Sequence, residues 1–287
     1  MKKYFYFSLM AIAIMFSATS CKTDKPTTPP SPGDIEFFKF TPQIVESQRL
    51  AAQLEVYDTA MYYYVEQMPI WKFEQNGGKE GVHETFDKAY FQYLEELYGG
   101  QYTWQQLMIG SFKKGNMIVD TRETLGVNSL WWDQEYVLYC YGVNYETAEQ
   151  ITPTYTIHMN TPAPKKSDMT FDVQITEKTP DGVVGKIIPS NKDEKYFLAF
   201  QTKKYCETYM TKAENGELVD GHPASEYPIW DIVDSFGNDV TYATGDFEIT
   251  KETVLTRVNV KSTNKYYLII CGFDGGCTTK VEYIPMF

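Results

Sequence analysis

The sequence predicts a mainly β protein with two tandem antiparallel β-sandwiches, each carrying a short helical insertion. Three observations lead to this fold class. The 287 residues are 43% hydrophobic and 16% aromatic, which is enough apolar surface to exclude disorder over most of the chain. The second half of the chain repeats the residue pattern of the first half. Both halves contain short runs of alternating apolar and polar residues, bounded by turn-forming residues.

The first 20 residues form an export signal. Lys2 and Lys3 supply a positive start, residues 4–16 an apolar run, and residues 18–20 a small-residue cleavage site directly before Cys21. The apolar run is shorter than the roughly 20 residues that a membrane-spanning helix needs. The segment resembles a bacterial lipoprotein signal, and this resemblance implies that Cys21 is lipidated and becomes the mature N-terminus. A plain secretory signal followed by an incidental cysteine is the alternative.

Residues 21–35 are predicted to form a Pro-rich tether. Residues 22–33 read KTDKPTTPPSPG, and such a segment favours extended polyproline geometry over a packed core. The sequence around Cys21 and Asp24 resembles surface-displayed lipoproteins of Bacteroidota. That resemblance implies a protein anchored by lipid to the outer membrane, facing the cell surface or, as the alternative, the periplasm.

The charge balance is acidic. Removing residues 1–20 deletes two lysines and no acid, so the formal charge falls from -12 to -14. A nucleic-acid-binding face needs clustered Lys and Arg residues, which this sequence does not show. Nucleic acid is therefore excluded as the expected partner.

An internal repeat divides the folded part into two similar domains. Residues 130–144 match residues 260–274 at an offset of 130, and residues 58–65 match residues 193–200 at an offset of 135. The matched segments follow in the same order in both copies. We therefore predict domains at residues 36–160 and 161–287, with the segment NTPAPKKSD at residues 160–168 linking them.

Each copy is predicted to consist of short strands. Leu50, Ala52, Leu54 and Val56 alternate with Ala51, Gln53 and Glu55, a pattern typical of a strand with one buried face. The turn segments at residues 180–182 and 274–276 contain Asp and Gly, which tolerate positive φ. The predicted strands cover residues 50–56, 62–67, 136–141 and 154–159 in the first copy, and 171–176, 183–188, 196–202, 254–260, 266–271 and 279–284 in the second.

A matched tyrosine suggests the type of sandwich. Leu130 lies six positions before Tyr136, and Val260 lies six positions before Tyr266. From each tyrosine, every second residue suits burial until a glycine is reached. The pattern is similar to the tyrosine corner of fibronectin type III and immunoglobulin-like sandwiches, in which the phenol bonds to the backbone of the corner. The resemblance covers most of residues 36–287 and implies two tandem fibronectin-III/Ig-like domains.

Helical insertions are predicted in both copies. In the first, apolar residues recur at helical spacing up to the glycines at 99–100, and residues 103–108 form a second short helix; the recurring residues are Phe86, Tyr90, Tyr93, Leu94 and Leu97. In the second copy, Ser225 is expected to cap a helix over residues 227–236, which ends at Gly237. This Tyr and Leu stripe is expected to pack in the core, with a ligand platform as the alternative.

The sequence contains no recognised catalytic or metal-binding motif. His83, His158 and His222 do not stand at metal-ligand spacing, and GxSxG, P-loop, GxGxxG and HExxH patterns are absent. Paired carboxylates such as Glu95 and Glu96 lie on a predicted amphipathic helix, where they form a solvated face. We therefore predict no cofactor, no metal and no enzymatic activity, although a site assembled from scattered loops remains open.

The cysteines allow one local disulfide. Cys271 and Cys277 flank the predicted last hairpin, and an exported protein can oxidise them. Cys140 has the inward parity of its strand, so a buried free thiol is expected there.

The predicted function is non-catalytic binding or adhesion, with a protein partner favoured because sandwiches present loops and sheet edges. A glycan-binding accessory protein is the alternative, since Trp and Tyr rings stack on sugars. Trp131 and Trp132 are the candidate platform, because adjacent residues of an extended chain point to opposite faces and one ring can then lie outside the core. Packing of both rings in the core is the favoured alternative. A cryptic hydrolase is a third possibility, which requires a cleft where carboxylates or a histidine converge.

Overall fold

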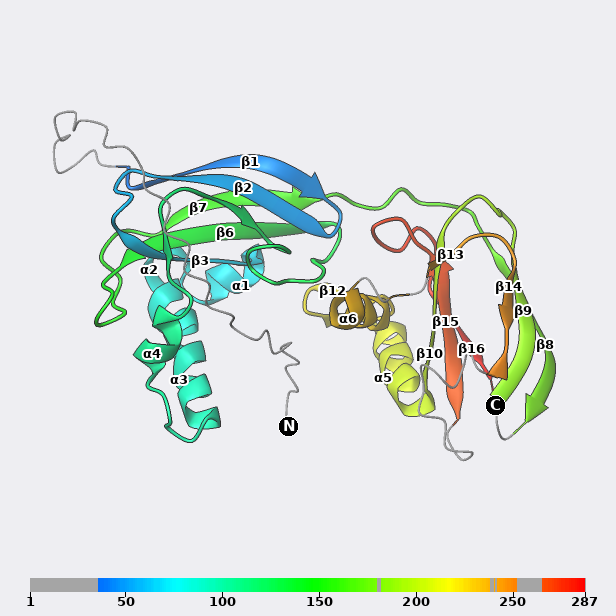
Figure 1. The fold of residues 1–287 in the computed structure, drawn as a ribbon. Helices are drawn as coiled ribbons and strands as arrows, with labels where there is room; N and C mark the ends of the chain where they lie inside the picture. The colour runs from blue at the N-terminus through cyan, green and yellow to red at the C-terminus, as the bar shows by residue number, and fades with distance from the viewer. Residues whose placement is uncertain (1–35, 180–181, 238–239, 241, 252–264, 287) are drawn as a thin grey trace.

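The computed structural model describes residues 36–287 except 180–181, 238–239, 241, 252–264 and 287. It contains two antiparallel β-sandwiches in tandem, followed in Figure 1 from blue and green to yellow and red. Among the described residues, no helix is long and apolar enough to cross a membrane.

The first sandwich pairs a three-stranded sheet with a four-stranded sheet. The three-stranded sheet has the order β1-β2-β5 and the four-stranded sheet the order β4-β3-β6-β7, with antiparallel neighbours throughout. The strands are β1 (Phe38–Glu46), β2 (Arg49–Val56), β3 (Tyr62–Pro69), β4 (Lys113–Lys114), β5 (Met117–Asp120), β6 (Gln134–Val143) and β7 (Tyr155–Thr161).

The second sandwich repeats this topology. Its sheets have the orders β14-β9-β8 and β13-β10-β15-β16, again antiparallel. The strands are β8 (Phe171–Thr179), β9 (Gly182–Pro189), β10 (Tyr196–Thr202), β13 (Tyr242–Ala243), β14 (Phe247–Ile249), β15 (Tyr266–Gly272) and β16 (Glu282–Pro285). The repeated segments found in the sequence correspond to β3 with β10 and to β6 with β15, which confirms the predicted fold class from the sheet order itself.

The four-stranded sheets are buried on both faces. Every residue of β15, and every residue of β6 from Tyr136 onward, is buried. In each sandwich one face of this sheet packs against the three-stranded sheet to form the inner core. The other face is covered by the helical insertion of the same copy. Each domain therefore has three layers, two sheets and a helical cover.

The helical insertions follow the second strand of each four-stranded sheet. In the first domain, β3 continues into α1 (Ile70–Gln75), α2 (Gly78–Val82), the π-helix η1 (His83–Asp87), α3 (Lys88–Leu97) and α4 (Trp104–Ile109). In the second, β10 continues into α5 (Lys203–Glu214), the short strands β11 (Leu218–Val219) and β12 (His222–Pro223), and α6 (Tyr227–Phe236). The helices of the first insertion hang below its sheet in Figure 1.

Several local expectations were wrong. The residue before α6 is Glu226, and neither it nor Ser225 makes a side-chain capping bond; the Glu226 carboxylate instead accepts a hydrogen bond from Trp132. Strand β16 begins at Glu282 rather than at residue 279, because the Thr279 hydroxyl accepts the Gly272 N–H at 2.8 Å and the chain turns there. The strand expected at residues 254–260 lies outside the described residues.

The two sandwiches share one hydrophobic cluster. This cluster begins between the sheets of the first domain and continues to β10, β15, α5 and α6 of the second. The link between β7 and β8 also contacts the second domain, since Ser167 N–H donates to the Thr278 carbonyl at 2.9 Å and the Lys166 ammonium to the Cys277 carbonyl at 3.2 Å. The two domains are thus packed against each other as well as joined by the chain.

Candidate functional site

The helical pair α3–α4 of the first domain presents an exposed apolar tip. Tyr93, Leu97, Tyr98 and Tyr102 are 55%, 61%, 45% and 53% exposed. Tyr93 and Leu97 lie one helical turn apart on α3, and the two following tyrosines belong to the connection to α4. The prediction that Tyr93 and Leu97 pack in the core is wrong, because the inner side of α3 is filled by Phe91 instead. We call these four residues the α3–α4 tip, which points away from the sheets in Figure 1.

Local sequence explains why the tip protrudes. On the inner side of α3, Phe91 is buried against Tyr64 of β3, with ring centroids 6.1 Å apart. The helix ends at two glycines, Gly99 and Gly100, which have φ values of 64° and 73°. Thr103 then starts α4 with a capping box to Gln106. These signals bring the chain back against α3 and leave the residues of the turn exposed.

A depression of about 590 Å³ lies beside the tip. It is lined by Gln92, Glu95, Glu96, Gly99, Gly100 and Trp104. Glu95 accepts the Trp104 backbone N–H at 2.9 Å, and the Lys88 ammonium lies 5.1 Å from the centre of the Trp104 ring. The apolar tip therefore has an acidic border.

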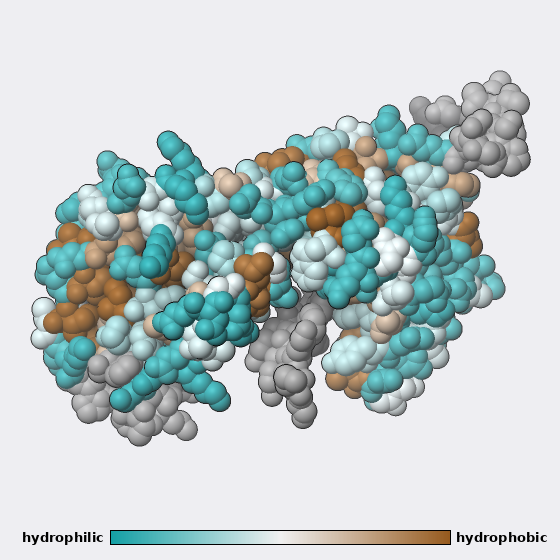
Figure 2. Space-filling view, turned by 180° about the vertical axis from the view of Figure 1, so that it is seen from behind, coloured by the Kyte–Doolittle hydropathy of each residue, from teal (hydrophilic) through white to brown (hydrophobic). Residues whose placement is uncertain are grey.

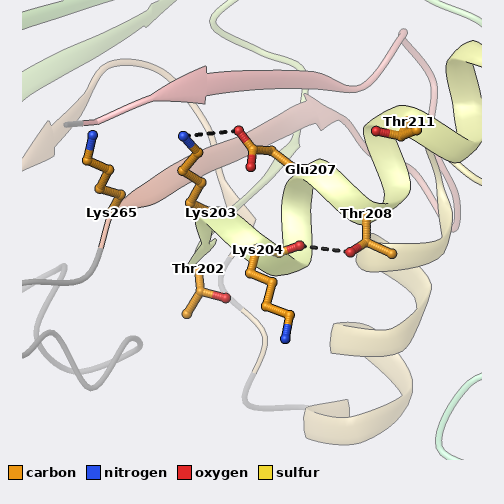
Figure 3. Close-up of a pocket in the computed structure, with 7 residues that line it drawn as sticks. All are labelled: Thr202, Lys203, Lys204, Glu207, Thr208, Thr211 and Lys265. Atoms are coloured by element: carbon orange, nitrogen blue, oxygen red, sulfur yellow. Dashed lines mark hydrogen bonds and ion pairs between the residues drawn. The ribbon is translucent and has the colours of Figure 1, made fainter. Parts of the chain in front are cut away.

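A second depression, of about 750 Å³, lies at the start of α5 (Figure 3). Its lining is mainly lysine and threonine, from Thr202, Lys203, Lys204, Glu207, Thr208, Thr211 and Lys265. The Lys203 ammonium pairs with Glu207 at 3.3 Å, while the Lys204 side chain points away from that pair. The Lys204 ammonium therefore lies apart from the Lys203–Glu207 pair.

The predicted glycan platform at Trp131 and Trp132 is wrong. Both side chains are 3% exposed, whereas a ring that stacks on a sugar needs an accessible face. Trp131 stacks on His222 and Trp230, with ring centroids 3.9 Å and 4.9 Å away, and Trp132 meets Phe273 edge-on at 5.8 Å. These partners all belong to the second domain, so both tryptophans form the contact between the domains.

Polar groups complete this domain contact. The Trp132 indole N–H donates to Glu226 at 2.8 Å, Ser129 N–H donates to the Asp234 carboxylate at 3.2 Å, and the Asn128 side-chain amide donates to the Asp234 carbonyl at 2.8 Å. Burial raises the pKa of Asp234 to about 6 and also raises the pKa of Glu226. The contact thus combines a buried aromatic centre with hydrogen bonds across it, while Trp131 Nε1, Trp230 Nε1 and His222 Nε2 are buried without a hydrogen-bond partner among the described residues.

The hairpin after β15 approaches the first domain without any spare room. A Cβ atom added to Gly276 would lie 2.5 Å from Cγ of Trp132, and one added to Gly275 would lie 2.5 Å from Oγ of Ser47. Real Cβ atoms essentially never come so close to a neighbour. The two glycines therefore allow the backbone of one domain to lie directly on side chains of the other.

Tyr136 lies on β6 and Tyr266 on β15, the strands that the internal repeat matches with each other. The Tyr136 oxygen accepts the Trp131 backbone N–H at 2.9 Å. For Tyr266, the matching Val260 lies outside the described residues. The tyrosine-corner role of Tyr136 and Tyr266 stays a prediction.

The thiols of Cys271 and Cys277 are neighbours in the last hairpin. Their sulfur atoms lie 3.6 Å apart, both thiols are free and both are buried. Cys140 is also a buried free thiol, and burial raises its pKa well above 9. A disulfide between Cys271 and Cys277 stays a prediction.

A buried polar cluster lies between η1 and the outer face of β6. The Asp87 carboxylate, 1% exposed, accepts the Tyr139 and Tyr141 hydroxyls at 2.7 Å and 2.8 Å. Burial raises the pKa of Asp87 to about 8, against the opposing effect of these two hydrogen bonds. His83 Nδ1 lies 3.1 Å from the Tyr141 oxygen. None of these contacts was expected from the sequence, because no local motif joins a π-helix to a strand far along the chain.

Comparisons with known proteins support no family assignment. No family model matches the chain, and no curated protein matches it. Among solved structures it is similar to fibronectin type III domains 1–3 of chicken CNTN1, with 8% identity and a TM-score of 0.26. That match covers 86% of this chain and 66% of the CNTN1 chain, so the chain spans just under two thirds of that structure.

The domain contact should weaken at acidic pH through His222. Burial lowers its pKa from 6.5 to about 4, and its Nε2 atom has no hydrogen-bond partner among the described residues. The unfolded chain takes up this proton below about pH 6.5 and the folded chain only near pH 4, so stability falls across that window. Between pH 7.5 and 5 we expect His222 to lower the free energy of unfolding by about 2 kcal/mol.

Urea unfolding followed by tryptophan fluorescence measures this effect. Between pH 7.5 and 5, the free energy of unfolding of the variant His222→Gln should fall by about 2 kcal/mol less than that of the original chain. Glu226 and Asp234 are present in both proteins, so their titration contributes equally to both. An identical pH dependence in the two proteins would show that His222 is not the responsible group.

The cysteine pair gives a second prediction. Oxidation would bring the two sulfurs from 3.6 Å to about 2.05 Å, a small movement within one hairpin. Thiol labelling of the unfolded, non-reduced protein should therefore detect two fewer thiols than labelling after reduction. The double variant Cys271→Ser/Cys277→Ser should show no such difference, and equal counts in the unchanged chain would exclude the disulfide.

Proposed function

We propose that this chain is a non-catalytic binding protein of the cell envelope that holds a protein partner at the α3–α4 tip. The observation that carries the proposal is the tip itself, with four large side chains each at least 45% exposed on one projecting turn. Exposed aromatic residues gathered in one place are typical of recognition surfaces. Other exposed hydrophobic residues, such as Tyr57 and Leu218, lie elsewhere on the described surface.

The surroundings of the tip define the chemistry of the partner. Glu95 and Glu96 line the depression next to it, so a suitable partner has an apolar centre with basic residues at its edge. In the view from behind, most of the described surface is hydrophilic, and hydrophobic residues gather mainly on the second sandwich (Figure 2). The tip differs from that region because its four half-exposed side chains gather at the end of α3 and in the connection to α4.

The packing of the two domains suits a presenting role. Trp131 and Trp132 are buried between the domains, and the hairpin backbone at Gly276 lies directly on the Trp132 ring. A fixed pair of domains lowers the entropy lost when a partner binds. Under the lipoprotein interpretation, Cys21 would anchor this rigid pair to the outer membrane and the segment 21–35 would hold it away from the lipid surface.

A glycan ligand is the second candidate, and the tyrosines of the tip are the observation that favours it. Tyr93, Tyr98 and Tyr102 expose about half of their side-chain surface, and phenol rings stack on sugar faces. The candidate platform thus moves from Trp131 and Trp132 to the tip.

Site-specific photo-crosslinking tests the protein-binding proposal. A photoreactive phenylalanine derivative at Tyr98, introduced in producing cells, should give one discrete protein adduct, and the same group at Tyr57 in the β2–β3 connection should give none. Adding Leu97→Asp should reduce the adduct at least tenfold, since burying one leucine is worth roughly 1.5–3 kcal/mol.

Equal adducts at Tyr98 and Tyr57, or none at either position, would contradict a protein-binding tip. In that case, glycan-array binding that is lost in Tyr98→Ala would identify the second candidate as correct.

The lipid anchor is tested at Cys21. The variant Cys21→Ser should move the protein from the membrane fraction to the soluble fraction, because no acyl chains can then attach to the residue. Mass analysis of the N-terminal peptide should show the added lipid in the original chain and its absence in the variant. The neighbouring change Ser20→Ala keeps a small residue at the cleavage site and should leave fractionation unchanged. Membrane association that persists in Cys21→Ser would contradict lipid anchoring.

A further inference from the structure

Three potential metal ligands converge at the base of the first helical insertion. His83 and Glu84 begin η1, and Glu149 belongs to the connection between β6 and β7. His83 Nε2 lies 3.5 Å from Oε1 of Glu84 and 3.9 Å from Oε2 of Glu149. All three ligand atoms lie within 4.8 Å of one another. The site is separate from the tip and from both depressions.

Hydrogen-bonding groups on the Nδ1 side of the imidazole orient His83. The Tyr139 and Tyr141 hydroxyls donate to the two carboxyl oxygens of Asp87 at 2.7 Å and 2.8 Å. With its hydrogen engaged there, the Tyr141 oxygen can accept a hydrogen bond from His83 Nδ1, which lies 3.1 Å away. This arrangement leaves a lone pair on Nε2, as a metal-binding imidazole requires.

The Nε2 atom is buried and has no hydrogen-bond partner among the described residues. The His83 residue is 3% exposed and faces the two carboxylates. A buried acceptor that faces two other acceptors is unfavourable, because the three atoms all carry lone pairs and repel one another. A cation placed between them removes this conflict.

Lys88 neutralises only part of the charge of the two carboxylates. Its ammonium lies 3.0 Å from Oε2 and 3.4 Å from Oε1 of Glu84, and 3.6 Å from Oε1 of Glu149. Glu149 directs Oε1 to Lys88 and Oε2 to His83. Two carboxylates and one lysine leave a formal charge of about -1 beside a neutral imidazole, which favours a further cation.

We propose that His83, Glu84 and Glu149 form a binding site for a divalent transition metal of the zinc type. One imidazole nitrogen and two carboxylate oxygens are a ligand set that zinc accepts, with a fourth position left for water. Bond lengths of about 2.0–2.2 Å in tetrahedral geometry place ligand atoms about 3.3–3.6 Å apart. His83 Nε2 lies 3.5 Å and 3.9 Å from the two carboxylates, and all three ligand atoms lie within 4.8 Å of one another. The Glu149 side chain, 51% exposed, can move to close the remaining distance.

Binding at this site would join two segments that are distant in sequence. Glu149 would tie the β6–β7 connection to η1, which leads directly into α3. The metal would therefore stabilise the base of the helical pair that carries the tip. This role concerns the structure of the first domain and does not depend on what the tip binds.

Calorimetric titration of the full chain with ZnCl₂, after treatment with a chelator and without a polyhistidine tag, tests the site. We expect one saturable Zn²⁺ per chain. Glu149→Gln removes a solvent-exposed ligand without disturbing the core and should weaken binding at least tenfold. Lys88→Gln removes a competing positive charge and should strengthen binding at least threefold.

His158→Gln is the matched control. His158 Nδ1 lies 2.9 Å from Glu135 at the exposed surface, so this pair reports adventitious binding by a histidine–carboxylate contact. The control should leave the stoichiometry and the affinity unchanged. No Zn²⁺ binding by the original chain, or equal losses in Glu149→Gln and His158→Gln, would overturn the proposal.

Discussion

The burial of β6 and β15 on both faces is the constraint on which the rest of the structure depends. The backbone groups of a strand in the middle of a four-stranded sheet form hydrogen bonds with the two neighbouring strands. Each apolar face of the strand still needs a separate layer to cover it. The three-stranded sheet covers one face, and the helical insertion covers the other. The insertions are therefore part of each core, and the α3–α4 tip is the portion of that cover that extends past the sheet.

Two-sided burial also explains the polar cluster of the first domain. Tyr139 and Tyr141 lie on the outer face of β6, where a phenol needs a hydrogen-bond partner once the helices exclude water. Asp87 supplies that partner for both rings, and the chain that holds Asp87 also places His83. In the second domain the corresponding face meets Cys206, Ile229 and Val233, so it forms an apolar contact instead.

The alternation in β2 and β8 and the glycine stops of α3 and α6 could be predicted from the sequence, because each depends on neighbouring residues. The repeat could be predicted because both copies keep the same residue pattern in the same order. Strand β1 carries a bulge between Pro42 and Ile44 that interrupts its alternation, and α5 has little apolar periodicity. Strand parity could not show that the second domain covers both Trp131 and Trp132. Similarly, His83 and Glu149 come together only because β3 and β6 pair, which no spacing rule in the sequence contains.

Gly276 ties the residue choice in one domain to that in the other. Its missing Cβ allows the hairpin to touch the Trp132 ring, and an added Cβ would lie 2.5 Å from Cγ of that ring. A side chain at position 276 therefore requires either a smaller residue at position 132 or a shift of the Trp132 ring. The two positions, 144 residues apart in the sequence, are expected to vary together.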